Sequence, residues 1–129
     1  MAGNIPPDLK YTQEHEWARQ QGSVVVVGVT DHAQSSLGDV VYVELPKVGA
    51  TLTAGKQFGV IESTKAVSDL FSPLSGKVVK VNEDLPNNPS VINTDPYGAG
   101  WILELEPSDS KQLAGLLDAA AYGNLVKNS

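Results

Sequence analysis

Four consecutive valines, Val24 to Val27, constrain the fold of this chain more than any other stretch. β-Branched side chains lose little rotamer freedom in a pleated sheet, so the run from Val24 to Val29 predicts a strand. A turn containing Gly22 precedes this run and joins it to a second extended segment, which indicates a hairpin. The sequence therefore favours β-structure over a helical fold.

The same pattern of short apolar runs between Gly and Pro turns continues along the chain. Further strands are expected at residues 9–12, 39–45, 57–61, 67–71, 77–82 and 101–106. A single helical turn is expected at residues 90–93. We predict a mainly β fold, an antiparallel sandwich or flattened barrel with helices at its periphery.

Two helices are expected outside the sheets. Thr30 is a suitable N-cap for a short helix near residues 31–37, and Gly38 suits its left-handed exit. Leucine and alanine then recur at helical spacing near the C-terminus, at Leu113, Leu116, Leu117 and Ala120. This spacing predicts one helix near residues 110–121, which ends or breaks at residues 122–124.

Composition limits the possible functions. At 129 residues the chain is expected to form one domain, residues 1–129. Its net charge of −6, with no Lys/Arg cluster, disfavours binding to nucleic acid or to an anionic membrane and suits partners with a basic docking face. No signal, transit or membrane-spanning segment is visible, so a cytoplasmic protein is expected.

Motifs for catalysis are absent from the sequence. There is no glycine-rich phosphate loop and no nucleophile elbow. With no cysteine and two histidines, little material exists for a thiol nucleophile or a catalytic metal site, and we expect no metal. A non-catalytic carrier or binding protein is therefore favoured over an enzyme.

The strongest candidate for chemistry is Lys65. It lies between the strands expected at 57–61 and 67–71, in the segment Glu62-Ser63-Thr64-Lys65-Ala66. This places it at a hairpin tip, where a side chain is easily presented to another molecule. A solvated turn lysine with no special role is the simplest alternative.

The neighbours of Lys65 favour acylation over catalysis. Glu62 and Asp69 stabilise a protonated amine, which disfavours a Schiff-base lysine. A lysine modified by a separate ligase needs only exposure, a defined turn and readable flanks. Thr64 and Ala66 are small and leave access open, and the two acids mark the site with charge.

Several motifs together resemble the glycine cleavage system H proteins, which are lipoyl carrier proteins. The segment from Glu62 to Asp69 resembles the family's lipoyl-attachment stretch. Other matching blocks, in order and at the family's spacing, are residues 15–17 (His-Glu-Trp), 28–34, 37–46, 72–76, 81–82 and 93–101. The resemblance covers nearly the whole chain, with one departure at Glu14, where relatives carry Ser.

This resemblance implies a lipoyl-domain-like fold in which Lys65 carries lipoate in amide linkage. The lipoyl arm would accept an aminomethyl group from glycine decarboxylase (P protein) and pass it to the aminomethyltransferase (T protein). Dihydrolipoyl dehydrogenase (L protein) would reoxidise it, and a lipoate ligase or transferase would attach it. The family's loaded arm rests in a cleft, to which Glu16 and Asp69 are matched here as carboxylates that attract a protonated amine.

Alternative carriers share a hairpin lysine. A lipoyl domain of a 2-oxoacid dehydrogenase is shorter and lacks the His-Glu-Trp segment and the leucine-rich C-terminal helix. A biotin carrier usually has Met beside its lysine, where this chain has Thr64 and Ala66. A lipoyl-relay protein that delivers lipoate to other enzymes, and an interaction module with an unmodified Lys65, also remain open.

Overall fold

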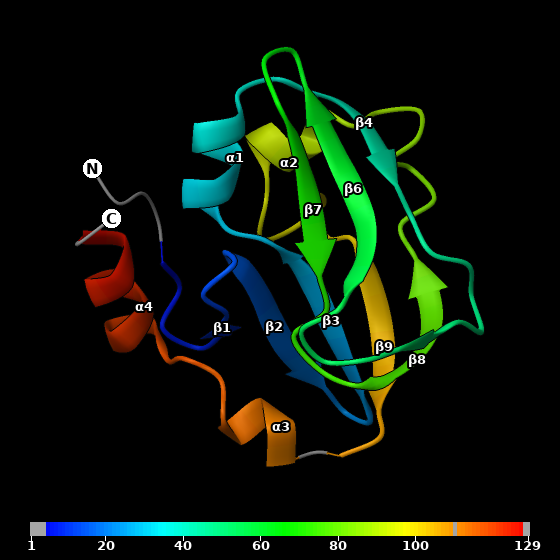
Figure 1. Ribbon diagram of the computed structural model, residues 1–129, viewed down its shortest axis with the longest axis vertical. Helices are drawn as coiled ribbons and strands as arrows, with labels where there is room; N and C mark the ends of the chain where they lie inside the picture. Colours follow the sequence, from blue (N-terminus) through cyan, green and yellow to red (C-terminus); the bar gives the residue numbers. More distant parts are fainter. Residues whose placement is uncertain (1–4, 110, 128–129) are drawn as a thin grey trace.

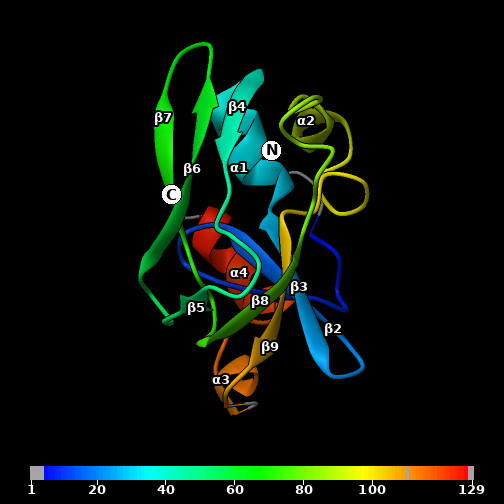
Figure 2. The same ribbon diagram turned by 90° about the vertical axis from the view of Figure 1, so that its right-hand side faces the viewer.

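Antiparallel pairing organises the structure, a computed structural model that describes residues 5–109 and 111–127. Within these residues the strands form a six-stranded sheet, ordered β1-β2-β3-β9-β8-β5, and a three-stranded sheet, ordered β4-β6-β7 (Figures 1 and 2). The strands are β1 Lys10–Tyr11, β2 Glu16–Gln21, β3 Val24–Val29, β4 Val40–Glu44, β5 Thr51–Leu52, β6 Gln57–Ser63, β7 Val67–Phe71, β8 Gly76–Val81 and β9 Leu103–Pro107. The expected mainly β fold is confirmed as two sheets, not a closed barrel.

The main core lies between the two sheets. The valine run forms β3 at the centre of the larger sheet, where it pairs with both β2 and β9. Buried side chains of both sheets meet in one cluster, which includes Val25, Val27, Val78 and Leu105 from the larger sheet and Val43, Ile61 and Leu70 from the smaller sheet. Burial of this apolar surface is the main force that holds the smaller sheet in place.

A second cluster covers the outer face of β1, β2 and β3. Tyr11, Trp17 and Val26 pack there against helix α4, Ala119–Lys127. The rings of Tyr11 and Tyr122 are stacked with centroids 4.6 Å apart. Because side chains alternate along a strand, Trp17 on this face requires Glu16 and Ala18 to point to the opposite face, toward the smaller sheet.

The short helices match their expected positions. Helix α1, Asp31–Leu37, begins at Thr30, whose Oγ1 accepts a hydrogen bond from the Ala33 amide at 3.2 Å. It ends at Gly38, whose φ is 82°. Helix α2, Val91–Thr94, is the single turn expected at residues 90–93. In residues 5–109 and 111–127 no helix has the length and apolar character needed to cross a membrane.

The single C-terminal helix expected near residues 110–121 is wrong. Residue 110 lies outside the described residues, and the remainder forms two helices, α3 Lys111–Ala114 and α4. The chain is extended between them because Leu117 and Tyr11 exchange backbone hydrogen bonds of 2.8 and 2.9 Å. Asp118 then starts α4 by accepting from the Ala121 amide at 2.8 Å. Residues 122–124, expected as a helix end, lie inside α4.

We predict that Gly28→Ala destabilises the fold by about 1–3 kcal/mol, because a Cβ there would lie 2.6 Å from the buried ring of Trp17. Chemical denaturation measures the change. Gly115→Ala is the control, since its nearest contact would be an ordinary 3.5 Å to the Gln112 carbonyl. Equal stability of the two variants would contradict this packing constraint.

Candidate functional site

The hairpin of β6 and β7 carries Lys65 at its tip, where Thr64, Lys65 and Ala66 are all exposed. Ser63 shapes the turn. Its amide donates to the Ala66 carbonyl at 2.8 Å, and its Oγ accepts from the amides of Ala66 and Lys65 at 3.0 and 3.3 Å. The turn is thereby hydrogen-bonded internally while the lysine side chain points out of the sheet ladder.

The tip is also attached to the segment between α1 and β4. The Thr64 amide donates to the Asp39 carbonyl at 3.0 Å. The aliphatic stem of Lys65 lies over Gly38, with its Cε 3.3 Å from the position that a Cβ of residue 38 would take. The lysine is therefore exposed on a hairpin whose position is defined by a second segment.

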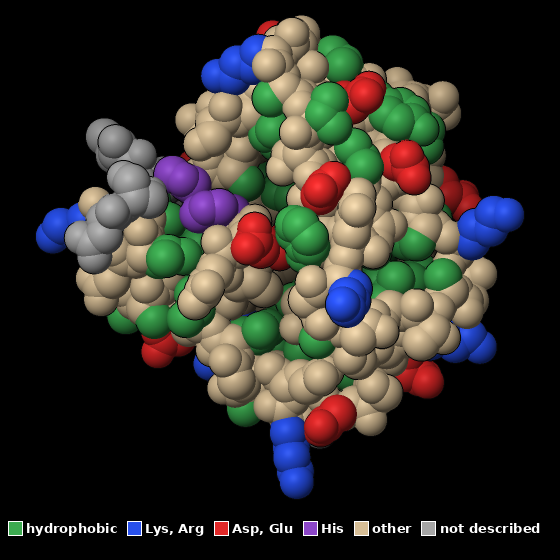
Figure 3. All heavy atoms as spheres, in the orientation of Figure 1, with side chains coloured by type: hydrophobic (Ala, Val, Ile, Leu, Met, Phe, Trp, Pro, Cys, Tyr) green, Lys and Arg blue, Asp and Glu red, His purple; other side chains and the backbone are tan. Residues whose placement is uncertain are grey.

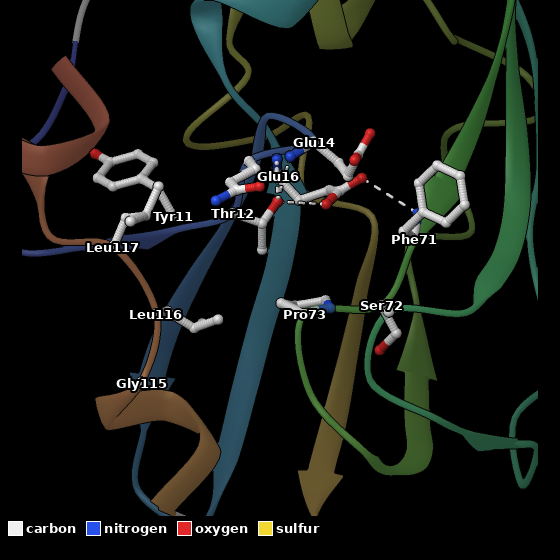
Figure 4. Close-up of a pocket in the computed structure, with 12 residues that line it drawn as sticks. Tyr11, Thr12, Glu14, Glu16, Phe71, Ser72, Pro73, Gly115, Leu116 and Leu117 are labelled. Carbon is white, nitrogen blue, oxygen red and sulfur yellow. Dashed lines mark hydrogen bonds between the residues drawn. The ribbon is translucent and has the colours of Figure 1, made fainter. Parts of the chain in front are cut away.

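Glu16 links β2 to the free edge of β7. Only 2% of Glu16 is exposed. Its carboxylate accepts from Thr12 Oγ1 at 2.6 Å and from the Phe71 amide at 3.2 Å (Figure 4). The Phe71 amide is free to donate to Glu16 because the hydrogen bond across the hairpin is made by the next residue. There the Ser72 amide donates to the Lys56 carbonyl at 2.9 Å.

Burial changes the acidity of Glu16. Desolvation raises the pKa of its carboxyl from 4.5 to about 7, against the opposing effect of the hydrogen bonds from Thr12 and Phe71. Glu16 therefore changes charge near neutral pH.

Two cavities adjoin the hairpin, one beside β1 and β2 and the other beside helix α1. One, of about 320 Å³, contains Glu16 (Figure 4). It is lined by Tyr11, Thr12, Gln13, Glu14, Glu16, Gly55, Phe71, Ser72, Pro73, Gly115, Leu116 and Leu117. The other, of about 370 Å³, is lined by Glu14, His15, His32, Ala33, Ser36, Leu37, Ala66, Val67 and Ser68. Glu14 lines both, so we treat these residues together as the hairpin groove, which runs from the lysine tip to Glu16.

Two histidines line the second of these cavities, and Figure 3 shows histidine side chains together at the surface in the region of helix α1. The rings of His15 and His32 have centroids 4.7 Å apart. His15 Nδ1 is 2.8 Å from the hydroxyl of Tyr122, which is 2.7 Å from Thr30 Oγ1. Burial, and secondarily His32, lower the pKa of His15, against an opposing effect of Glu14.

The sequence did not predict that His15 and His32 line the groove. His15 reads from the sequence as a structural neighbour of Trp17, and His32 as a polar residue of a short helix. No spacing relates either residue to the lysine segment, since a turn with a positive φ of 68° at His15 and helix α1 bring them together. Nothing in the sequence indicated that Leu116 and Leu117 line the groove either, because their position depends on the break between α3 and α4.

The predicted site residues fall into two groups. Ala66 and Glu16 line the hairpin groove. Glu62, Ser63, Thr64, Lys65 and Asp69 do not line either cavity. Asp69 is exposed, and its Oδ1 accepts from Gln57 Nε2 at 3.0 Å. In the described part of the chain, no three His, Asp or Glu residues are arranged to hold a metal ion. The arrangement suits a covalent arm on Lys65 that is laid along the groove.

A family model described as "Glycine cleavage H-protein" matches residues 9–129. Among curated proteins, the glycine cleavage system H protein of Myxococcus xanthus (strain DK1622) is 77% identical over 129 residues, covering 100% of both chains. That of Anaeromyxobacter sp. (strain K) is 61% identical over 123 residues, covering 95% of this chain and 96% of the relative.

Among solved structures, the fold is similar to the crystal structure of a glycine cleavage system H protein from Mycobacterium marinum. The TM-score is 0.85 at 44% sequence identity, and the match covers 93% of this chain and 97% of the other. The overall arrangement of sheets and hairpin is therefore shared with that protein.

We predict that Glu16 makes stability fall as pH rises from 4.5 to about 7. The folded chain holds a proton in this window that the unfolded chain has lost, so ionisation opposes folding. Relative to wild type, Glu16→Gln should gain up to about 3 kcal/mol between pH 5 and pH 8. Denaturant titrations at several pH values measure this, with Glu14→Gln at the exposed neighbour as control. Parallel stability curves for wild type and Glu16→Gln would contradict the assignment.

Proposed function

This chain belongs to the glycine cleavage H-protein family, and from that membership we propose that it is the lipoyl carrier of a glycine cleavage system. Lys65 is the attachment point of the lipoyl group. The observation that supports this most directly is the exposed lysine on a hydrogen-bonded tip that adjoins a groove. As a carrier, the chain makes and breaks no bond by itself and works in the cytoplasm.

The residues around Lys65 fit a lipoyl group. The tip contains no glycine, and hydrogen bonds between Ser63 and Ala66 hold its turn. The small side chains of Thr64 and Ala66 leave the Lys65 amine open to a lipoate ligase or transferase. When bound, lipoate supplies a disulfide that opens to carry an aminomethyl group and is re-formed by oxidation. Holding that group on one shuttle raises its effective concentration at each partner.

The hairpin groove is the proposed resting place of the arm. From Ala66 to Phe71 the chain advances five residues along β7, about 17 Å. A lysyl side chain extended by an eight-carbon acyl chain has a comparable reach, so its far end would lie near Glu16. The ionised carboxyl of Glu16 would attract the protonated amine of the cargo, and the walls of the groove would exclude water. We keep Asp69 as a second carboxylate for the same cargo, but it is exposed and lines neither cavity, so its contribution is expected to be smaller than that of Glu16.

Three enzymes are the proposed partners of the loaded carrier. Glycine decarboxylase (P protein) loads it, the aminomethyltransferase (T protein) unloads it, and dihydrolipoyl dehydrogenase (L protein) reoxidises it. A lipoyl-relay protein and a lipoyl domain that serves a 2-oxoacid dehydrogenase would also carry lipoate on Lys65. Glycine–bicarbonate exchange with a P protein distinguishes them, because only a glycine cleavage carrier supports it.

We predict that Lys65→Arg abolishes lipoylation and leaves the fold unchanged, because the arginine keeps the charge but cannot form the amide. Intact mass after co-expression with a lipoate ligase, together with a thermal melt, measures both effects. Lys56→Arg is the matched control, at the start of the same hairpin. The proposed function would be refuted if the Lys65→Arg chain gained the lipoyl mass, or if wild type failed to gain it.

We predict that Glu16→Gln shortens the lifetime of the aminomethyl-loaded carrier at pH 8 by about tenfold, since the loss of one partly buried charge interaction is of order 1.4 kcal/mol. Release of formaldehyde and ammonia from the isolated loaded protein measures the lifetime. Asp69→Asn is expected to have a smaller effect, because Asp69 is exposed. An unchanged lifetime in Glu16→Gln would remove Glu16 from the resting site.

A further inference from the structure

The outer face of the smaller sheet, turned away from the core, has an alternating pattern of apolar and acidic side chains. The register aligns Tyr42, Glu62 and Val67 in one row across β4, β6 and β7. It aligns Glu44, Val60 and Asp69 in the next row. Residues opposite one another across an antiparallel pair share a face, and so do residues two apart along a strand. The two rows therefore form one surface, which we call the checkerboard face.

A β-bulge enlarges the apolar part of this face near the lysine tip. The register of β4 against β6 shifts between Val40 and Tyr42, so Val41 is an extra residue in β4. Val41 and Tyr42 are consequently both exposed, by 52% and 49%, where strict alternation would bury one of them. Val67, on the edge strand two residues from Lys65, is 65% exposed.

Exposure of these large apolar side chains to water is unfavourable unless another surface covers them. Exposed large apolar side chains that gather on one face, with polar residues among them, mark interaction surfaces. Figure 3 shows hydrophobic and acidic side chains interspersed over this part of the molecule. A bulge is a specific local feature of a strand pair, which here places a second apolar side chain on the face.

The charge on the checkerboard face has one sign. Glu44, Glu62 and Asp69 contribute carboxylates, and the sequences of β4, β6 and β7 contain no Lys or Arg. Within residues 57–71, Lys65 at the hairpin tip is the one Lys or Arg. A complementary surface must therefore be cationic with apolar groups between its charges.

We propose that the checkerboard face, with Val41 and Tyr42 as its apolar anchors, is the docking surface for the enzyme that acylates Lys65. This inference rests on the proposed function. The partner is an acyltransferase whose active-site rim is basic and apolar. In the step it performs, the Lys65 nitrogen bonds to the carbonyl carbon of an activated lipoyl donor, the carbon's bond to its activating group breaks, and the ammonium gives up two protons to solvent and the leaving group.

The position of the face favours this partner over the others. An acylating enzyme must enclose the amine of Lys65 itself. Its contacts must therefore include the row of the checkerboard face nearest the tip, which contains Glu62 and Val67. Enzymes that act on the far end of the arm approach it about an arm's length away, on the groove side of β7. A second copy of this chain would bring the same carboxylates together, which is unfavourable.

The test compares acylation rates of exposed-residue variants. Val41→Ser and Tyr42→Ser, singly and together, are incubated with a purified lipoate ligase, lipoate and ATP, and lipoyl incorporation is followed by intact mass. Val48→Ser is the matched control, because Val48 is a valine of similar exposure, 60% against 52% for Val41, in the loop whose Gly49 amide donates to the Val78 carbonyl of β8. Thermal melts check that all variants are folded.

We expect kcat/KM for the double variant to fall about tenfold or more, mainly through KM, with the control within about twofold of wild type. Wild-type KM should also rise as salt is raised from about 0.01 M to about 0.1 M, where the Debye length falls from about 30 Å to about 10 Å.

Several results would overturn the inference and leave the proposed function intact. One is wild-type acylation kinetics in the double variant. Another is normal acylation with impaired glycine–bicarbonate exchange by the lipoylated double variant, which would assign the face to a different partner. A wild-type dimer in sedimentation that the double variant abolishes would assign it to a second copy. Failure of wild type to gain the lipoyl mass would instead refute the proposed function.

Discussion

The burial of one face of the β6–β7 hairpin is the constraint on which the rest of the site depends. Ile61 and Leu70 are buried against the larger sheet together with Val43 of β4. Because side chains alternate strictly along a strand, this burial decides which residues of the hairpin face outward and keeps its register from slipping. It also fixes the free edge of β7 beside the larger sheet. Both the groove and the checkerboard face follow from this single packing arrangement.

Glu16 is where packing and charge oppose each other. The alternation that buries Trp17 under α4 directs Glu16 between the sheets, where Thr12 and the edge of β7 supply only two hydrogen bonds. Its pKa is therefore raised to about 7, and an ionised Glu16 opposes folding at alkaline pH. A buried carboxylate kept at this cost is typical of a functional group, and the proposed cargo, a protonated amine, is the partner that would stabilise it.

On the proposed function, the two sides of β7 serve different stages of the carrier's life. The groove side, with Glu16 and the pair His15 and His32, shelters the loaded arm after modification. The outer side serves the enzyme that installs the arm. A protein that catalyses nothing by itself must be recognised repeatedly at one lysine. Val67, which lines the groove and also lies in the first row of the checkerboard face, is where the two surfaces meet.

The sequence alone determined the strands, helix α1 and the hairpin that presents Lys65, because valine runs, capping residues and Gly turns act over a few neighbouring residues. The resemblance to a known family also predicted Glu16 as a cleft residue, a prediction that stays a proposal here. Only the tertiary structure decided which residues surround the groove. The hydrogen bonds from the Phe71 amide to Glu16 and between His15 and Tyr122 join residues far apart in the chain. The same holds for the extended break at Leu117, where pairing with Tyr11 overrides helical spacing, and for the bulge at Val41. These features depend on strand register and burial, which local sequence patterns do not specify.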